Sequence, residues 1–190
     1  RVGDPEVPWR KNIPIPNVPG DVEIAPVEDG RTLNDAIASG VLDALIGLEP
    51  PSCFAAGVPG VARLFSDWRA VEHDYFVDTG IFPIMHAVGI KRDLLKANPW
   101  IAPSLFEAFS TAKDMAVREL AVTNAPKATL PWVAAELHAT TNAMGEDYWP
   151  YGIGKNRKVL DNLIRYSFED GLISRRLSIE ELFAPSMLDT

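Results

Sequence analysis

The stretch that decides the fold is TGIFPIMHAVGIKRD, from Thr79 to Asp93, in which one histidine interrupts an otherwise apolar run. Successive side chains of a strand point to opposite faces of a sheet. Both faces of this run are apolar, because Phe82 lies on one face and Met85 on the other. Strands that are apolar on both faces belong to sheets covered by helices on two sides. The sequence therefore predicts an α/β fold in which this run is a buried strand.

Two roles are open for His86, which lies in the middle of this run. A buried imidazole needs hydrogen-bond partners, so His86 is either a structural residue bonded to neighbouring backbone or a group that lines a cleft. Histidine titrates near neutral pH and is therefore suited to general acid catalysis. The residue types alone leave both roles open.

Composition limits the class of protein. The chain has 190 residues, 47% of them hydrophobic, which is enough for one sizeable core or two small lobes. Its 18 basic residues are scattered among 26 acidic ones, giving a net charge of -8, so we expect no nucleic-acid partner. No apolar run approaches the roughly 20 residues of a membrane helix, so we expect no membrane partner. The lone cysteine, Cys53, excludes an internal disulfide and fits packing in a cytoplasmic protein.

Turn-forming residues divide the chain. Six prolines between Pro5 and Pro26 predict an extended, turning segment. The sequence starts at Arg1 with neither an initiator methionine nor a signal-peptide pattern, which suggests that upstream sequence is missing. The irregular stretch EPPSCFAAGVPG predicts a hinge crossing at residues 51–60.

Helix signals are strongest in the second half of the chain. Apolar residues spaced by three and four predict helices over 99–120, 131–144 and 156–170. Earlier, Thr32 predicts the cap of a short helix that ends at Gly40. Near the end, Ser178 and Glu181 form a capping-box pattern. Residues 42–47, LDALIG, are expected to form a short strand.

Six segments in order resemble the 4,5-dihydroxyphthalate decarboxylase family. The resemblance implies a type II periplasmic-binding-protein-like fold, with two α/β lobes around a cleft. It places this chain in the C-terminal part: residues 1–50 belong to the second lobe, 61–190 form its remainder with the C-terminal helices, and an upstream first lobe is missing. The segments are EDGRTLNDAIASGVLDALIG (28–47), PPSCF (50–54), TGIFPIMHAVGIKRD (79–93), TLPWVAAEL (129–137), MGEDYWPYGIGKNR (144–157) and LSIEELFAPSML (177–188).

The resemblance also implies an activity, namely the cofactor-independent conversion of 4,5-dihydroxyphthalate to protocatechuate and carbon dioxide. A non-catalytic solute-binding protein for a small organic anion is the alternative, because folds of this kind commonly serve either role. The implied partner is a small aromatic acid. The chain is expected either to form a homo-oligomer or to depend on a missing N-terminal portion, because absent sequence would leave apolar surface exposed.

The chemistry of such a substrate selects candidate site residues. Protonating the ring carbon requires an acid, for which His86 is the candidate. Guanidinium groups bind carboxylates in bidentate fashion, although each arginine also has a simple surface interpretation. The aromatic candidates are alternatively core residues under a loop. The predicted substrate-binding residues are Ser52, Arg63, Arg69, Arg92, Tyr148 and Trp149.

No metal site is expected. Glu72, His73 and Asp74 are the closest approach to one, but adjacent residues seldom converge on a single ion. We interpret this triplet as a solvated turn.

Overall fold

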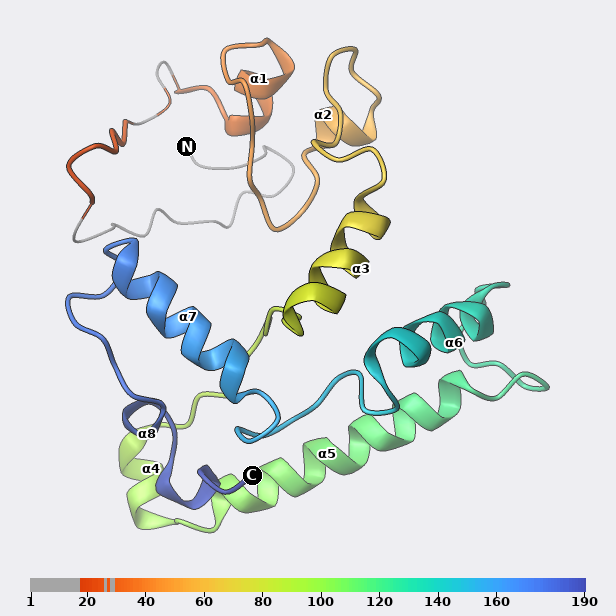
Figure 1. The fold of residues 1–190 in the computed structure, drawn as a ribbon, viewed down its shortest axis with the longest axis vertical. Coiled ribbons are helices and arrows are strands. Elements are labelled where there is room, and N and C mark those ends of the chain that lie inside the picture. Colours follow the sequence, from red (N-terminus) through yellow and green to blue (C-terminus); the bar gives the residue numbers. More distant parts are fainter. Residues whose placement is uncertain (1–17, 26, 28–29) are drawn as a thin grey trace. The chain divides into compact units, whose positions relative to one another are not determined.

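The described part of the chain is helical. The computed structural model describes residues 18–25, 27 and 30–190, and every regular element among them is a helix (Figure 1). Most of the proline-rich segment lies outside the described residues. The helices are α1 (Leu33–Ala38), α2 (Ser52–Ala55), α3 (Trp68–Thr79), α4 (Arg92–Ala97), α5 (Ile101–Leu120), α6 (Val133–Met144), α7 (Arg157–Glu169), α8 (Ile179–Leu182) and the 3-10 helix η2 (Pro185–Met187).

The helices predicted from caps and periodicity are confirmed. The Thr32 side chain accepts a hydrogen bond from the Asp35 N–H at 3.1 Å, and the Asp35 carboxylate accepts one from the Thr32 N–H, so a capping box starts α1. Ser178 and Glu181 make the same reciprocal pair at the start of α8. The long helices α5, α6 and α7 lie within the three ranges predicted for them.

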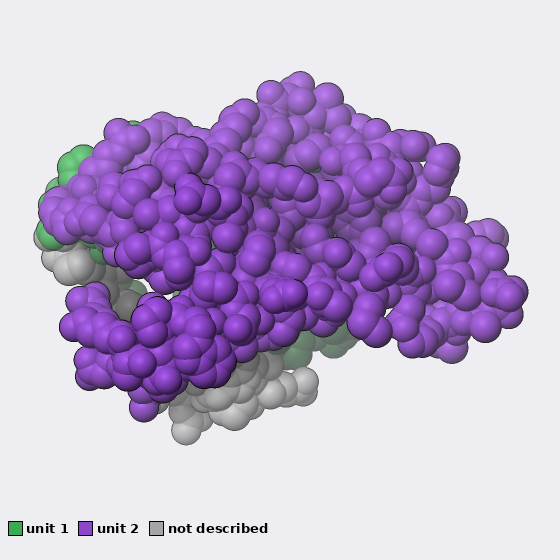
Figure 2. Space-filling view, turned by 90° about the horizontal axis from the view of Figure 1, so that it is seen from below, with its two compact units in different colours: residues 1–72, 168–174 green, residues 73–167, 175–190 purple. Residues whose placement is uncertain are grey.

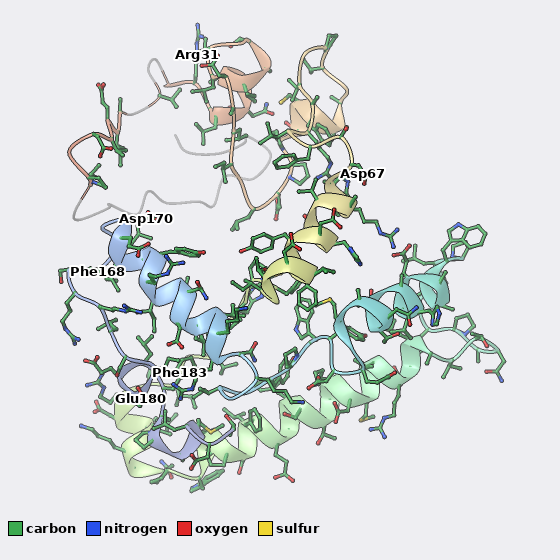
Figure 3. The ribbon with its side chains drawn as sticks, viewed as in Figure 1. Arg31, Asp67, Phe168, Asp170, Glu180 and Phe183 are labelled. Carbon is green, nitrogen blue, oxygen red and sulfur yellow. The ribbon has the colours of Figure 1, made fainter. Side chains whose placement is uncertain are left out.

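Three helices were not predicted. Glu72, His73 and Asp74, which were interpreted as a solvated turn, lie in the helix α3 instead. Its start is marked by Asp67, labelled in Figure 3, whose Oδ1 accepts a hydrogen bond from the Ala70 N–H at 3.1 Å. This is the geometry of a helix N-cap. The short helices α2 and α4 begin without a side-chain cap, so no capping residue predicted them from the sequence.

The predicted strands are wrong for the described residues. Residues 42–47 and 81–90 contain no strand. His86 is not buried, because it lies in a run of exposed residues. A strand is stabilised by hydrogen bonds to a neighbouring strand, and no described segment pairs with either run. The α/β prediction is therefore corrected to a helical fold for this part of the chain.

The chain divides into two compact units, coloured separately in Figure 2. Unit 1 comprises residues 1–72 and 168–174, and unit 2 comprises residues 73–167 and 175–190. The division into 1–50, a 51–60 hinge and 61–190 stays a prediction. In unit 1, the Cys53 N–H donates to the Asn34 Oδ1 at 2.9 Å, and Cys53 is buried. This contact joins α2 to α1.

Unit 2 is organised around α5. This helix contacts both α6 and η2, and Figure 1 shows α6 running alongside it. None of the helices in the described ranges is long and apolar enough to cross a lipid bilayer. The buried hydrophobic residues of unit 2 are Ala102, Ile153, Leu160, Ile164 and Ile179.

Candidate functional site

A cavity of about 310 Å³ lies in unit 2, between α5 and the segment 146–151 that follows α6. Its volume is at the lower end of the range for small-molecule sites, roughly 300–1,000 Å³. Residues three and four apart lie on one face of a helix, and this spacing brings the α5 residues to the same wall. The lining comprises Phe106, Ser110, Lys113, Asp114 and Val117 of α5, with Glu146, Asp147, Tyr148, Trp149 and Tyr151 of the opposite segment.

Lys113 is the cation of this cavity. Its Nζ donates a hydrogen bond to the Asp147 Oδ1 at 2.8 Å and lies 3.7 Å from the Asp114 Oδ1. The same nitrogen is 5.2 Å from the ring centroid of Tyr151, within the range of a cation–π contact. The side chain is only 15% exposed. The ammonium group is therefore fixed in position at the edge of an aromatic surface.

The charges around Lys113 shift two pKa values in opposite directions. Burial pulls the Lys113 pKa down, but the hydrogen bond to Asp147 and the charges of Asp147 and Asp114 outweigh burial and raise it. Hydrogen bonds from Lys113 and then Lys155, whose Nζ is 2.6 Å from the Asp147 Oδ2, lower the Asp147 pKa.

These shifts set the pH range of the ion pair. A lowered carboxylate pKa contributes stability above the pKa of the unfolded chain, and this contribution is lost as the pH falls through the lower, folded value. A raised lysine pKa contributes stability below the unfolded value, which is lost as the pH rises through the folded one. The Lys113–Asp147 pair therefore contributes fully between the ordinary pKa of an aspartate and that of a lysine, and its contribution is lost only as the pH falls through the lowered pKa of Asp147 or rises through the raised pKa of Lys113.

Tyr148, Trp149 and Tyr151 form the aromatic wall of the cavity. This wall contacts the apolar run that holds His86. The rings of Phe82 and Trp149 pack edge to face, with centroids 5.5 Å apart and an interplanar angle of 60°. Trp149 lines the cavity, and Phe82 lies four residues before His86. This contact places the run beside the cavity wall within unit 2.

Hydrogen bonds to backbone atoms hold the segment 146–154, here called the wall segment, in place. The Asn156 Nδ2 donates to the Pro150 carbonyl at 2.9 Å and to the Gly152 carbonyl at 2.8 Å. The Gly154 N–H donates to the Thr190 carbonyl oxygen at 2.5 Å, and the Ile153 N–H donates to the Thr190 Oγ1 at 3.3 Å. The segment that carries the aromatic residues is therefore anchored by Asn156 and by Thr190.

Gly152 permits the close approach of Thr190, so its replacement by alanine is expected to destabilise unit 2. A Cβ at this position would lie 2.8 Å from the Thr190 carbonyl carbon, and φ is +90°. Gly145 is a matched control, since its φ is +87° and an added Cβ would meet nothing within 4 Å. In urea unfolding, Gly145→Ala should cost about 1–3 kcal/mol, because its φ of 87° and ψ of 175° lie in a region essentially confined to glycine, and Gly152→Ala about 1–3 kcal/mol more. Equal losses would show that the Thr190 contact imposes no constraint.

Of the predicted site residues, two line the cavity, namely Tyr148 and Trp149. Arg92, the first residue of α4, and His86 also lie in unit 2, but both are exposed and neither lines the cavity. His86 makes no hydrogen bond or ion pair with the described residues. The structural role considered for it, a buried ring bonded to backbone, is therefore wrong.

The remaining predicted residues lie in unit 1. Ser52 is the first residue of α2 and is partly exposed. The Arg63 guanidinium lies 5.0 Å from the Trp68 ring centroid and 5.5 Å from that of Phe54. Arg69 lies in the first turn of α3. Arg63 and Arg69 therefore lie in a different unit from the cavity beside α5, and Arg92 does not line that cavity.

Sequence reasoning missed the charged residues of the cavity. Lys113 and Asp147 are 34 positions apart, so no local spacing joins them. The segment GEDYWPYG was singled out for its aromatic residues, while its two carboxylates were not considered. No group of three or more metal-ligating side chains that could hold an ion occurs in the part of the chain that the structure describes.

Two curated proteins match the chain. The 4,5-dihydroxyphthalate decarboxylase of Comamonas testosteroni is 36% identical over 173 residues, which are 91% of this chain and 52% of that protein. A protein of the same name from Pseudomonas putida is 39% identical over 59 residues, 31% of this chain and 23% of that protein. No family model matches the chain. The chain spans about half the length of the Comamonas relative. Over nearly all of its own length, the chain is therefore similar to a 4,5-dihydroxyphthalate decarboxylase.

Proposed function

We propose that the complete protein decarboxylates 4,5-dihydroxyphthalate to protocatechuate and carbon dioxide without a cofactor, and that the aromatic acid binds in the cavity beside α5. The names of the two relatives support the reaction. The position of Lys113 at the edge of an aromatic surface supports the site. An aromatic acid needs a flat apolar surface for its ring and a cation for its carboxylate.

The net charge of the cavity shows that a dianionic substrate requires a second cation besides Lys113. Three carboxylates line the cavity with one ammonium group, so a dianionic substrate needs a further cation. Arg92 does not line the cavity, so its role as this cation, for which a guanidinium is suited, stays a prediction. The roles of Ser52, Arg63 and Arg69 in substrate binding stay predictions.

The reaction consumes one proton. A hydroxyl group para to the departing carboxylate donates electron density to the carbon that bears it, and we propose that His86 protonates this carbon as a general acid. The bond between the ring and the carboxylate then breaks. Its electron pair restores the aromatic ring, carbon dioxide leaves, and a C–H bond replaces the lost carboxylate. His86 afterwards regains its proton from solvent.

We further propose that the complete protein has the two-lobed, type II periplasmic-binding-protein-like fold and is cytoplasmic. The chain described here would form the C-terminal part of that fold. The similarity to a relative of about twice the matched length supports this proposal. The additional sequence of such a protein would provide the strands that pair with the two unpaired runs.

A second candidate function is binding without catalysis. The observation that favours it is the position of His86, which is exposed and does not line the cavity. A small organic anion would then be held by Lys113 and the aromatic wall, and no proton would be transferred.

One assay tests the activity and separates the two candidates. The chain is incubated with 4,5-dihydroxyphthalate, alone and together with the unmatched half of the Comamonas relative made as a separate polypeptide. Carbon dioxide and protocatechuate are measured, and binding is followed by calorimetry. Phthalate is the control, because without hydroxyl groups it can bind but cannot activate the ring carbon. Release of carbon dioxide from 4,5-dihydroxyphthalate but not from phthalate supports the enzyme. Binding of 4,5-dihydroxyphthalate and phthalate without carbon dioxide release, with or without the added half, supports the binding protein. If neither binding nor carbon dioxide release is seen, the proposed site is wrong.

A further inference from the structure

The carboxylates that line the cavity differ in their partners. Both oxygens of Asp147 are engaged, since Oδ1 accepts a hydrogen bond from Lys113 at 2.8 Å and Oδ2 accepts one from Lys155 at 2.6 Å. The Asp114 Oδ1 lies 3.7 Å from the Lys113 Nζ. The side chain of Glu146, in contrast, lines the cavity without a hydrogen bond or ion pair to any of the described residues. Its two oxygens are therefore open to a ligand.

A carboxylate in this position favours a ligand that carries hydrogen-bond donors. An ionised carboxylate only accepts hydrogen bonds, with about four lone-pair sites on its two oxygens. A ligand carboxylate near Glu146 would be repelled by it, whereas Lys113 attracts such a group. The cavity therefore suits a ligand with an anionic group for Lys113 and donor groups for Glu146.

The proposed substrate combines these two kinds of group. The carboxylates of 4,5-dihydroxyphthalate lie at one edge of the ring, and its two adjacent hydroxyl groups lie at the opposite edge. Phenolic hydroxyl groups are hydrogen-bond donors, and two adjacent ones match the two oxygens of one carboxylate. Hydrogen bonds to an ionised acceptor are roughly twice as strong as neutral ones.

We infer that Glu146 binds the two hydroxyl groups of the substrate and thereby selects dihydroxylated aromatic acids over acids without hydroxyl groups. A site built to bind a hydroxyl group rejects the analogue that lacks it, because the polar group of the site is then left unpaired. This role accounts for a carboxylate beside an anionic substrate. The inference rests on the proposed binding site beside α5, but it does not depend on turnover or on His86.

Calorimetric titration of this chain with 4,5-dihydroxyphthalate and with phthalate tests the inference. The two acids differ only in the hydroxyl groups, so the ratio of their dissociation constants measures what those groups contribute. The unchanged chain should bind the dihydroxy acid about 10- to 100-fold more tightly, the range for hydrogen bonds to a charged group. Glu146→Gln should reduce this preference about 10-fold. It should also leave the affinity for phthalate unchanged or higher, because a repelling charge is removed.

Three further variants are the controls. Glu107→Gln makes the same change of charge at an exposed position of α5 that does not line the cavity, so it should leave the ratio unchanged. Asp114→Asn should also keep the ratio, since Asp114 lies near the ammonium group. Lys113→Met should weaken the binding of both acids and keep the preference between them.

The outcomes separate the role of Glu146 from the proposed site. If both acids bind but the unchanged chain shows no preference, or if Glu146→Gln keeps the full preference, the inference is wrong and the site at Lys113 stands. A preference lost in Asp114→Asn and kept in Glu146→Gln would assign the hydroxyl contact to Asp114 instead. If neither acid binds to the unchanged chain, the proposed site itself is wrong, and the role of Glu146 is wrong with it.

Discussion

Replacing Lys113 by methionine is expected to lower the affinity for an aromatic acid about 10- to 100-fold, the range for losing a hydrogen bond to a charged group. Methionine retains most of the length and apolar volume of the lysine stem, while the ammonium group is removed. The cavity would then be lined by three carboxylates with no cation. Repulsion of the substrate carboxylates adds to the loss of the direct contact. Calorimetric titration with 4,5-dihydroxyphthalate measures the effect.

Lys155→Met is the matched control for this experiment. Lys155 pairs with the same carboxylate as Lys113, with its Nζ 2.6 Å from the Asp147 Oδ2, but its side chain is 67% exposed and does not line the cavity. Exposed ion pairs contribute little, so the control should bind the acid almost normally. If the two variants lost affinity equally, the effect would come from Asp147 and the net charge, and Lys113 would not be the anchor.

The different exposure of Lys113 and Lys155 could not be predicted from the sequence. Both lysines belong to otherwise ordinary stretches, one on a helix and one in a loop. The fold alone places Lys113 between α5 and the wall segment, because Asp147 approaches it from 34 positions further along the chain. Long-range ion pairs leave no periodic pattern, so only the three-dimensional structure identifies them.

Local signals, in contrast, predicted the helices well. The capping boxes at Thr32 and Ser178 involve residues three apart, and both formed as expected. On the third predicted helix, the apolar residues Leu160 and Ile164 are buried, whereas Leu163 is 53% exposed. The missed helix α3 carries no such one-sided apolar stripe, and none of its residues is buried. Its only clear signal was Asp67 at the N-cap, which was not weighed.

The strand predictions failed for a physical reason. Alternation and apolar content describe how a segment would pack in a sheet, but a strand forms only when another segment supplies hydrogen bonds. Residues 81–90 have the required side chains and no paired neighbour among the described residues. The strand prediction is therefore wrong for residues 81–90 as the structure describes them, because a side-chain pattern does not by itself supply a partner strand.

The exposure of His86 simplifies the test of its role. Substitution of an exposed residue that makes no hydrogen bond usually changes stability by less than about 0.5 kcal/mol. His86→Gln should therefore leave the melting temperature of this chain, measured by itself, nearly unchanged. Glutamine retains approximate volume and hydrogen-bonding capacity but removes the imidazole that would donate the proton. Any loss of turnover then reports chemistry and not folding.

If His86 is the general acid, His86→Gln is expected to lower turnover of 4,5-dihydroxyphthalate by roughly 100-fold or more, the usual contribution of general acid catalysis. Substrate affinity should stay close to that of the unchanged chain, because a general acid acts in the transition state and contributes little to substrate binding. A fall in kcat with little change in KM marks an interaction used after substrate binds. Asn98→Gln is a neutral control, a substitution at a partly exposed amide just after α4. The preparation used is one in which the unchanged chain turns over substrate. Melting temperature, calorimetric affinity and carbon dioxide release are then measured on one such preparation of each variant. Normal carbon dioxide release by His86→Gln would remove His86 from the mechanism while leaving Lys113 and the aromatic wall as the binding site.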